Sequence, residues 1–200
     1  QPGRPGRCAV FLDGEYAFSM SAEELLEHRL RVGDVLPEER VHQLAEALER
    51  RRARERAARM LARRWCSEEE VRQRLRQQGF PPDVIELALE DLRQAGLLDD
   101  RRFAQTWVHD RLTAGRAGRE RLAWELRARG VDRQVAEECL AEVTEADEFR
   151  LGMELAQRRY QRLRDEEPEA QRRKLASLLQ RRGYSYDTID KILRNILSPD

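Results

Sequence analysis

The chain has 200 residues, of which 38% are charged and 40% apolar, and its 38 Lys and Arg residues balance 38 Asp and Glu. This composition is typical of a helix-rich protein and excludes a disordered one, because the apolar residues are numerous and periodic. No apolar run reaches the roughly 18 residues of a transmembrane helix, so we expect no membrane association. Cys8, Cys66 and Cys139 are odd in number and far apart, which argues against a disulfide framework and favours a cytoplasmic location.

The segment CAVFLDGEYAFS at 8–19 predicts a β-hairpin, because its central Asp-Gly pair is preferred in two-residue type I′ turns. Such a turn would pair Phe11 with Tyr16 and Ala9 with Phe18, placing the three aromatic rings on one side. We expect that side to pack on the helix that follows. The alternative is a strand edge offered to a partner.

Helix signals follow the hairpin. Ser21 and Glu24 have the spacing of a capping box that opens a short helix. From Pro37 to about Trp65 the apolar spacing predicts one long helix or two nearly continuous helices. Ser67-Glu-Glu-Glu70 has the spacing of a second capping box.

An internal repeat of about 50 residues fills the rest of the chain. VRQRLRQQGFPPDVIELALEDL from residue 71, LAWELRARGVDRQVAEECLAEV from 122 and LASLLQRRGYSYDTIDKILRNI from 175 share one apolar skeleton. Gly79, Gly130 and Gly183 coincide when the three are aligned without gaps. Each glycine fits the left-handed residue that ends a helix, where a β-carbon is unfavourable. The repeat predicts a tandem array of one supersecondary unit that presents a surface to a partner.

The expected fold class is therefore mainly α, an elongated tandem array of three three-helix repeats preceded by a short N-terminal β-hairpin and helices. The expected boundaries are 1–20 for the tail and hairpin, 21–52 for an N-terminal helical region, 53–98 for the first repeat, 99–146 for the second and 147–200 for the third.

Residues suited to catalysis or metal binding do not cluster in the sequence. His28, His42 and His109 are isolated from one another and from any ligand set. The glycine-rich loop at 114–118 joins two helices and lacks the preceding strand of a phosphate-binding loop. We expect no catalytic residue, no metal and no cofactor, and therefore no enzyme.

The three tryptophans differ in their expected positions. Trp65 and Trp107 fall on apolar stripes and are predicted to be core residues. Trp124 lies about 200° around its helix from Leu122, which marks the buried face. It either packs against the neighbouring repeat, which we favour, or is an exposed anchor for a partner.

The formal net charge is zero, but charge is segregated along the chain. Residues 50–64 are mostly cationic and residues 132–148 mostly anionic, which suits docking to a patterned partner surface. The alternative is two solvated helix faces. The third helices of the first two repeats are acidic, which argues against sequence-specific DNA reading; non-specific DNA contact through the arginines remains a possibility.

Two motifs identify a family that the chain resembles. GLLDDRRFA at 96–104 and GRERLAWELRARGV at 118–131 are similar to hallmarks of the RecX family of recombinase regulators. The hairpin and the segment LRVGD at 30–34 resemble its longer members. The resemblance spans roughly residues 8–197 and is strongest at 67–143.

The resemblance implies a non-enzymatic protein that binds the RecA recombinase. Members of the family lie along the helical groove of the RecA–DNA filament and restrain its ATP hydrolysis, its strand exchange and its stimulation of repressor self-cleavage. We expect a cytoplasmic monomer that acts in DNA recombination, DNA repair and the SOS response, with single- or double-stranded DNA as a weak or indirect partner.

Our hypothesis for the contact residues follows from the charge segregation. Basic and aromatic contacts to RecA or DNA are assigned to Arg52, Arg56, Arg59, Arg63, Arg116, Arg119, Trp124 and Arg127, and an acidic contact face to Glu137, Glu138 and Glu142. The rival function is a nucleic-acid-binding helical module that acts without RecA. A scaffold for another helical assembly is a third possibility.

Overall fold

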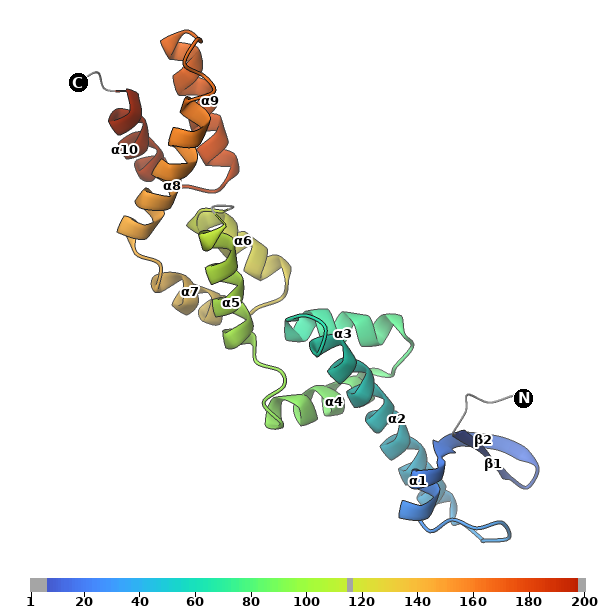
Figure 1. Ribbon diagram of the computed structural model, residues 1–200. Coiled ribbons are helices and arrows are strands. Elements are labelled where there is room, and N and C mark those ends of the chain that lie inside the picture. The colour runs from blue at the N-terminus through green and yellow to red at the C-terminus, as the bar shows by residue number, and fades with distance from the viewer. Residues whose placement is uncertain (1–6, 115–116, 198–200) are drawn as a thin grey trace. The chain divides into compact units, whose positions relative to one another are not determined.

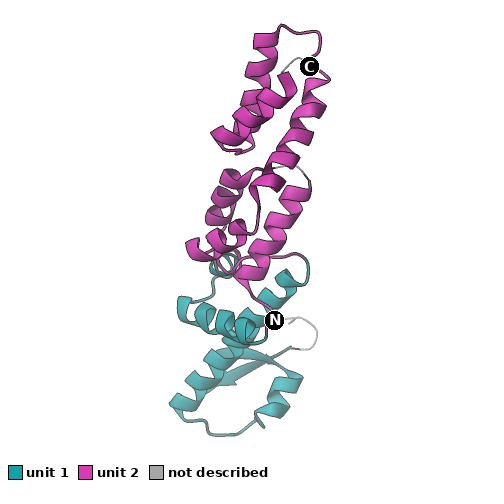
Figure 2. Cartoon of the chain, turned by 90° about the vertical axis from the view of Figure 1, so that its left-hand side faces the viewer, with its two compact units in different colours: residues 1–63, 72–95 teal, residues 64–71, 96–200 magenta. Residues whose placement is uncertain are grey.

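The computed structural model describes residues 7–114 and 117–197, which divide into two compact units. The N-terminal unit comprises residues 7–63 and 72–95, and the C-terminal unit comprises residues 64–71 and 96–197 with a gap at 115–116 (Figure 2). Most of the described residues are helical, and a two-stranded hairpin precedes the helices (Figure 1). The predicted class, mainly α with three-helix repeats behind a β-hairpin, is confirmed.

The hairpin consists of β1 (Arg7–Leu12) and β2 (Glu15–Ser21), joined by a turn in which Asp13 and Gly14 have φ values of 50° and 86°. Two positive φ values in succession are what a type I′ turn requires, so the predicted turn is confirmed.

The predicted register of the hairpin is only partly right. Phe11 pairs with Tyr16, but a β-bulge then pairs Phe18 with Val10 rather than with Ala9. Because the bulge adds one residue to β2, Phe18 turns to the opposite side from Tyr16. Phe18 is buried in a core with Met20, whereas Phe11 and Tyr16 are 60% and 59% exposed. The expected common aromatic side is therefore wrong.

Two helices follow the hairpin. The short helix α1 (Ala22–Glu27) opens with the predicted capping box between Ser21 and Glu24. The helix α2 (Glu38–Leu61) is a single uninterrupted helix, and it buries Leu44 and Leu48 against Phe18 and Met20. The sequence pattern predicts that this helix ends at about Trp65. The observed end lies four residues earlier.

The helix α3 (Glu68–Gln77) leads into α4 (Pro82–Gln94), which packs against α2. An ion pair supports this packing: Arg50 Nε donates to Asp91 Oδ2 at 2.8 Å, and a second bond from its Nη2 reaches Oδ1. The guanidinium group holds the pKa of the Asp91 carboxyl below its usual value.

The C-terminal unit contains two groups of three helices. The first group is α5 (Asp100–Thr113), α6 (Arg119–Ala128) and α7 (Arg133–Ala141), and the second is α8 (Glu145–Tyr160), α9 (Pro168–Arg181) and α10 (Tyr186–Leu197). Each group encloses its own apolar core, the first around Phe103, Leu122 and Leu126, and the second around Leu175, Leu179 and Ile192.

The three aligned glycines all adopt the left-handed conformation, as predicted. Their φ values are 85° at Gly79, 76° at Gly130 and 77° at Gly183. The residue after each glycine donates its N–H to a carbonyl five residues earlier: Phe80 to Leu75 at 3.3 Å, Val131 to Leu126 at 3.1 Å and Tyr184 to Leu179 at 3.2 Å. This is the Schellman arrangement, so the repeated sequence corresponds to one recurring helix end. Across residues 7–114 and 117–197, none of the helices has the length and apolarity needed to cross a membrane.

Candidate functional site

The start of α6 is capped by the end of α9, which lies about 60 residues later. Gly118 N–H donates to the Arg182 carbonyl at 2.6 Å, and Glu120 N–H donates to the Gly183 carbonyl at 3.1 Å. A β-carbon on Gly118 would lie 2.5 Å from the Gly183 oxygen, so only glycine permits this approach. The N-cap and an N–H of the first turn of α6 therefore donate to the two carbonyls that follow the end of α9.

A similar contact occurs at Ser67, immediately before α3. The Ser67 hydroxyl donates to the Arg129 carbonyl at 2.6 Å and accepts from Glu70 N–H at 3.2 Å. A β-carbon on Gly130 would lie 2.6 Å from the Glu69 Cγ atom. The glycine turn of each of the last two repeats thus packs against the start of the second helix in the preceding repeat.

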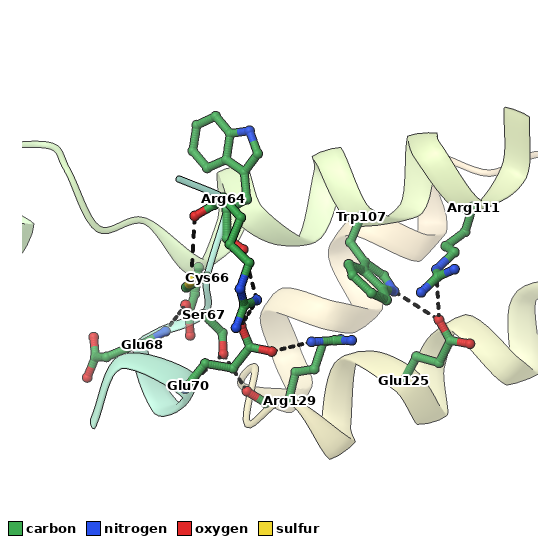
Figure 3. A network of polar contacts seen from close by, with 11 residues as sticks. Arg64, Cys66, Ser67, Glu68, Glu70, Trp107, Arg111, Glu125 and Arg129 are labelled. Atoms are coloured by element: carbon green, nitrogen blue, oxygen red, sulfur yellow. Dashed lines mark hydrogen bonds and ion pairs between the residues drawn. The ribbon is translucent and has the colours of Figure 1, made fainter. Parts of the chain in front are cut away.

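A network of charged side chains extends from Ser67 into α5 and α6 (Figure 3). The Glu70 carboxylate accepts from Arg64 at 3.0 Å and from Arg129. The Arg129 guanidinium lies over the Trp107 ring at 3.8 Å from its centroid, and the Trp107 indole donates to Glu125 at 3.0 Å. Since arginines hold the Glu70 carboxylate, only the serine half of the predicted capping box at Ser67 forms.

Two predictions about the tryptophans are wrong. Trp65 is 47% exposed, because it follows the end of α2 and helical periodicity no longer applies to it. Trp124 is 59% exposed, because it lies on α6 away from Leu122 and no neighbouring helix covers it among the described residues. The alternative of an exposed indole is the one the structure supports. Trp107 is half-buried against the core, as predicted.

Three of the predicted basic residues meet in one hollow of the N-terminal unit, named here the arginine-lined hollow. Arg52, Arg56 and Arg59 line it from α2, and its volume is about 560 Å³. Arg63 is exposed but does not line the hollow. The other lining residues come from the hairpin, from α2 and from the α3–α4 turn: Arg7, Tyr16, Ser19, Glu55, Gln78 and Phe80.

Sequence reasoning missed the part of the arginine-lined hollow that lies outside α2. Arg7 and Tyr16 are more than 30 positions away from Arg52 in the chain, and no local pattern indicates that they meet. The one signal that the sequence offered was the hairpin itself, for which a strand edge offered to a partner was the alternative.

The other predicted basic residues belong to the C-terminal unit. Arg119 and Arg127 are exposed on α6, on either side of Trp124 in sequence. Arg119 shares a second hollow, of about 470 Å³, with Glu137, Glu145 and Lys191. Arg116 lies outside the described residues.

The predicted acidic face is largely paired with neighbouring polar groups. Arg133 donates to Glu137 at 2.7 Å, Arg101 donates to Glu138, and the Gln105 amide donates to Glu142 at 3.4 Å. Glu142 lines a different hollow from Glu137. The three carboxylates therefore do not form one open acidic surface.

Reactive groups are not concentrated in the described part of the chain. No three His, Cys, Asp or Glu side chains are placed there to hold a metal ion. Burial raises the pKa of the Cys66 and Cys139 thiols, which favours the unreactive protonated form. Two surfaces stand out as candidate functional features: Trp124 with its flanking arginines, and the arginine-lined hollow.

Comparison with known proteins places these features in a family. Models of the first, second and third three-helix domains of RecX match residues 53–92, 99–140 and 146–193. The regulatory protein RecX of Clostridium botulinum (strain Eklund 17B) is 31% identical over 194 residues, covering 96% of this chain and 91% of that protein. The regulatory protein RecX of Amycolatopsis mediterranei (strain U-32) is 37% identical over 139 residues, covering 68% and 79%.

Solved structures agree with this assignment. A crystal structure of regulatory protein RecX superposes with a TM-score of 0.77 at 25% identity, covering 94% of both chains. Three domain matches in the expected order, together with relatives that span nearly the whole chain, show that the protein belongs to the RecX family of regulatory proteins.

Proposed function

We propose that the protein is a non-enzymatic regulator of the RecA recombinase that binds along the RecA–DNA filament. It would mostly inhibit ATP hydrolysis, strand exchange and the stimulation of repressor cleavage. The observation that carries this proposal is the match to proteins named regulatory protein RecX over 96% of the chain. Family membership of that extent makes a regulatory role the simplest function for a chain with this sequence.

The arrangement of repeats supports binding to a repetitive partner. We assign the repeats to residues 53–98, 99–146 and 147–200, behind a hairpin region and an N-terminal helical region. Each repeat would meet a successive part of the filament, and several weak contacts on one chain add through their effective concentration.

The contact surface that we propose for RecA centres on Trp124. Its indole is 59% exposed on a helix that also carries Arg119 and Arg127. Tryptophan and arginine are the residue types most enriched among the residues that dominate binding energy at protein interfaces. Glu137 and Arg119, which line one hollow beside this helix, would contribute polar contacts at the rim.

The decisive experiment is a titration of the protein into RecA, single-stranded DNA and ATP, with phosphate release as the readout. We expect the rate of phosphate release to fall as the protein approaches stoichiometry with RecA, and the filaments to shorten. Unchanged hydrolysis and unchanged filament stability at stoichiometric protein would exclude the proposed role.

A second candidate function is nucleic-acid binding without RecA. The observation that favours it is the arginine-lined hollow, in which four arginines face one carboxylate. This function predicts that the protein alone binds DNA with a steep dependence on salt concentration, because bound phosphates release counterions.

A further inference from the structure

We propose that the arginine-lined hollow is a binding site for single-stranded nucleic acid. Its guanidinium groups would hold the phosphates, and a base would stack on Tyr16. The inference rests on the second candidate function and deepens it, because it names the kind of nucleic acid and the groups that would hold its phosphates and bases. It does not depend on any action on RecA.

Positive charge in the arginine-lined hollow is not compensated by the protein. Arg7, Arg52, Arg56 and Arg59 line it together with a single carboxylate, that of Glu55. That carboxylate is 3.8 Å from Arg59 and also serves Arg51, at 3.4 Å, so it neutralises little of the charge in the hollow. Several arginines outside the hollow, by contrast, form close pairs with carboxylates, as Arg50 does with Asp91, Arg72 with Glu86 and Arg64 with Glu70.

Two of these arginines share a neutral acceptor. Arg7 donates to the Ser19 carbonyl at 2.6 Å, and Arg52 donates to the same oxygen. The Arg52 Nε atom is buried and has no hydrogen-bond acceptor among the described residues. Two cations that meet at one uncharged oxygen repel each other, and a buried donor without an acceptor is costly. An anion bound in the hollow would relieve the repulsion between the two cations.

The shape of guanidinium groups favours a phosphate as that anion. Arginine presents a planar fork of N–H groups that matches two oxygens of a phosphate or a carboxylate. Arg56 and Arg59 lie three positions apart on exposed turns of α2, so consecutive phosphates of one strand can each meet a guanidinium group.

Aromatic rings beside the arginines distinguish nucleic acid from an acidic protein segment. Tyr16 and Phe80 line the same hollow, and Tyr16 is 59% exposed. Phe11 meets the Tyr16 ring edge-on, with centroids 6.0 Å apart and planes at 76°, which fixes the ring's orientation. Exposed aromatic rings next to cationic side chains are how proteins bind single strands, whose unpaired bases are free to stack. A carboxylate-rich peptide would leave these rings without a stacking partner.

The test is a fluorescence-anisotropy titration of the full-length protein, without RecA, using a labelled oligothymidylate of about 15 nucleotides. We expect the variant carrying Arg56→Gln and Arg59→Gln to bind at least about tenfold more weakly. Its slope of log K against log salt should fall by about 1.4, at about 0.7 for each phosphate that is no longer neutralised. We expect Tyr16→Leu to bind about tenfold more weakly while leaving that slope unchanged, because it removes stacking and no charge.

Matched controls separate the site from general electrostatics. Arg172→Gln with Arg173→Gln removes the same charge from exposed positions on α9 and should leave the affinity unchanged. Circular dichroism of each variant confirms folding. Equal losses of affinity in the two double variants would overturn the proposed site while leaving nucleic-acid binding intact.

Competing ligands test the chemistry of the occupant. An abasic strand of equal length should compete about tenfold less well than oligothymidylate, and duplex DNA should also compete less well. If polyglutamate displaces the oligonucleotide as effectively as unlabelled oligothymidylate does, the hollow accepts an acidic protein segment and the proposal is wrong. Undetectable binding of any strand overturns both this inference and the second candidate function, and leaves the RecA assay unaffected.

Discussion

Trp124 exposes most of a large apolar ring on the outer side of α6. The geometry of the helix alone predicts that the side chain points away from the core, because of its angle around the helix from the buried Leu122. Whether a neighbouring repeat would cover the ring depended on tertiary packing, which the local sequence does not contain. An exposed indole of this size suits a partner surface.

We expect Trp124→Ala to change the melting temperature by no more than about 2 °C, because the ring contributes little to the core. The same variant should weaken binding to RecA filaments by at least about tenfold, measured by sedimentation or surface plasmon resonance. Trp107→Ala is the control, and its melting temperature should fall clearly because Trp107 packs on the core and donates to Glu125. A large drop for Trp124→Ala would show that its indole stabilises the fold.

Because of Tyr184, the stability of the third repeat is expected to depend on pH in the alkaline range. Burial of the ring, followed by the nearby Glu148 carboxylate, raises the pKa of Tyr184 to about 12. The folded state therefore keeps the phenol proton between about pH 10 and pH 12, where an unfolded chain releases it. The stabilising effect is complete below about pH 10 and is lost as the pH rises through the folded value.

We expect the unfolding free energy of the wild type to decline by about 2–3 kcal/mol more than that of Tyr184→Phe between about pH 9 and pH 12. Urea denaturation at a series of pH values measures this difference, and the comparison cancels the titration of residues common to both proteins. Parallel declines would mean that the phenol is not buried in the folded state.

Among the helices, the repeats differ most clearly in what surrounds the helix ends. Gly79, Gly130 and Gly183 share one backbone conformation, but their surroundings differ. A β-carbon on Gly79 would meet nothing within 4 Å, whereas one on Gly183 would lie 2.5 Å from the Arg121 backbone nitrogen. The first glycine serves only its turn, and the last also serves a contact between repeats.

This difference predicts unequal effects of the same substitution. Gly79→Ala should cost about 1–2 kcal/mol of unfolding free energy, the penalty for a left-handed alanine. Gly183→Ala should cost at least about 2 kcal/mol more, because the methyl group forces the α6 start away from the turn. Urea denaturation compares the two variants directly. Equal costs would show that the contact between repeats adds nothing to stability.

The alignment of three glycines was sufficient to predict the turns and the helices around them, because the apolar period and the helix-ending residue are both local signals. The contact of Gly183 with Gly118 was not predictable in this way, since it joins residues that are 65 positions apart. Helix ends were predicted less well than helices: α2 ends at Leu61, before Trp65, the last apolar residue of its sequence pattern.

Across the whole molecule, stability is expected to vary from repeat to repeat. In tandem arrays each repeat contacts only its neighbours, so damage to one repeat spreads no further than the next. The core around Phe18 and Met20 belongs to the N-terminal unit, and the cores around Phe103 and Leu175 belong to the C-terminal unit. Within the C-terminal unit, the third repeat contacts the second through its glycine turn.

We therefore expect Gly183→Ala to raise amide hydrogen exchange in α9, α10 and the first turn of α6, while exchange in α2 stays at the wild-type rate. Hydrogen exchange followed by mass spectrometry resolves these segments. A uniform increase across all helices would indicate that the chain unfolds as a single cooperative unit.

The sequence predicts the net charge of the molecule and the blocks of charge along the chain, but not which charged side chains pair with each other. The sequence indicates blocks of opposite sign; the structure shows that Glu137 and Glu138 are neutralised by arginines of their own unit, while three arginines of α2 remain grouped in a hollow. Pairing depends on which helix faces which, and composition carries no information about that.

The close approach of Gly118 to Gly183 also constrains how this protein can evolve. A β-carbon on Gly118 would meet backbone atoms of Gly183 and Tyr184, and one on Gly183 would meet backbone atoms of Arg121. Because a clash with backbone is not removed by changing the side chain of the other glycine, both positions should remain glycine in descendants of this sequence for as long as the two segments stay in contact. A replacement at either position would therefore mark, in sequence alone, a contact between repeats that has been remodelled.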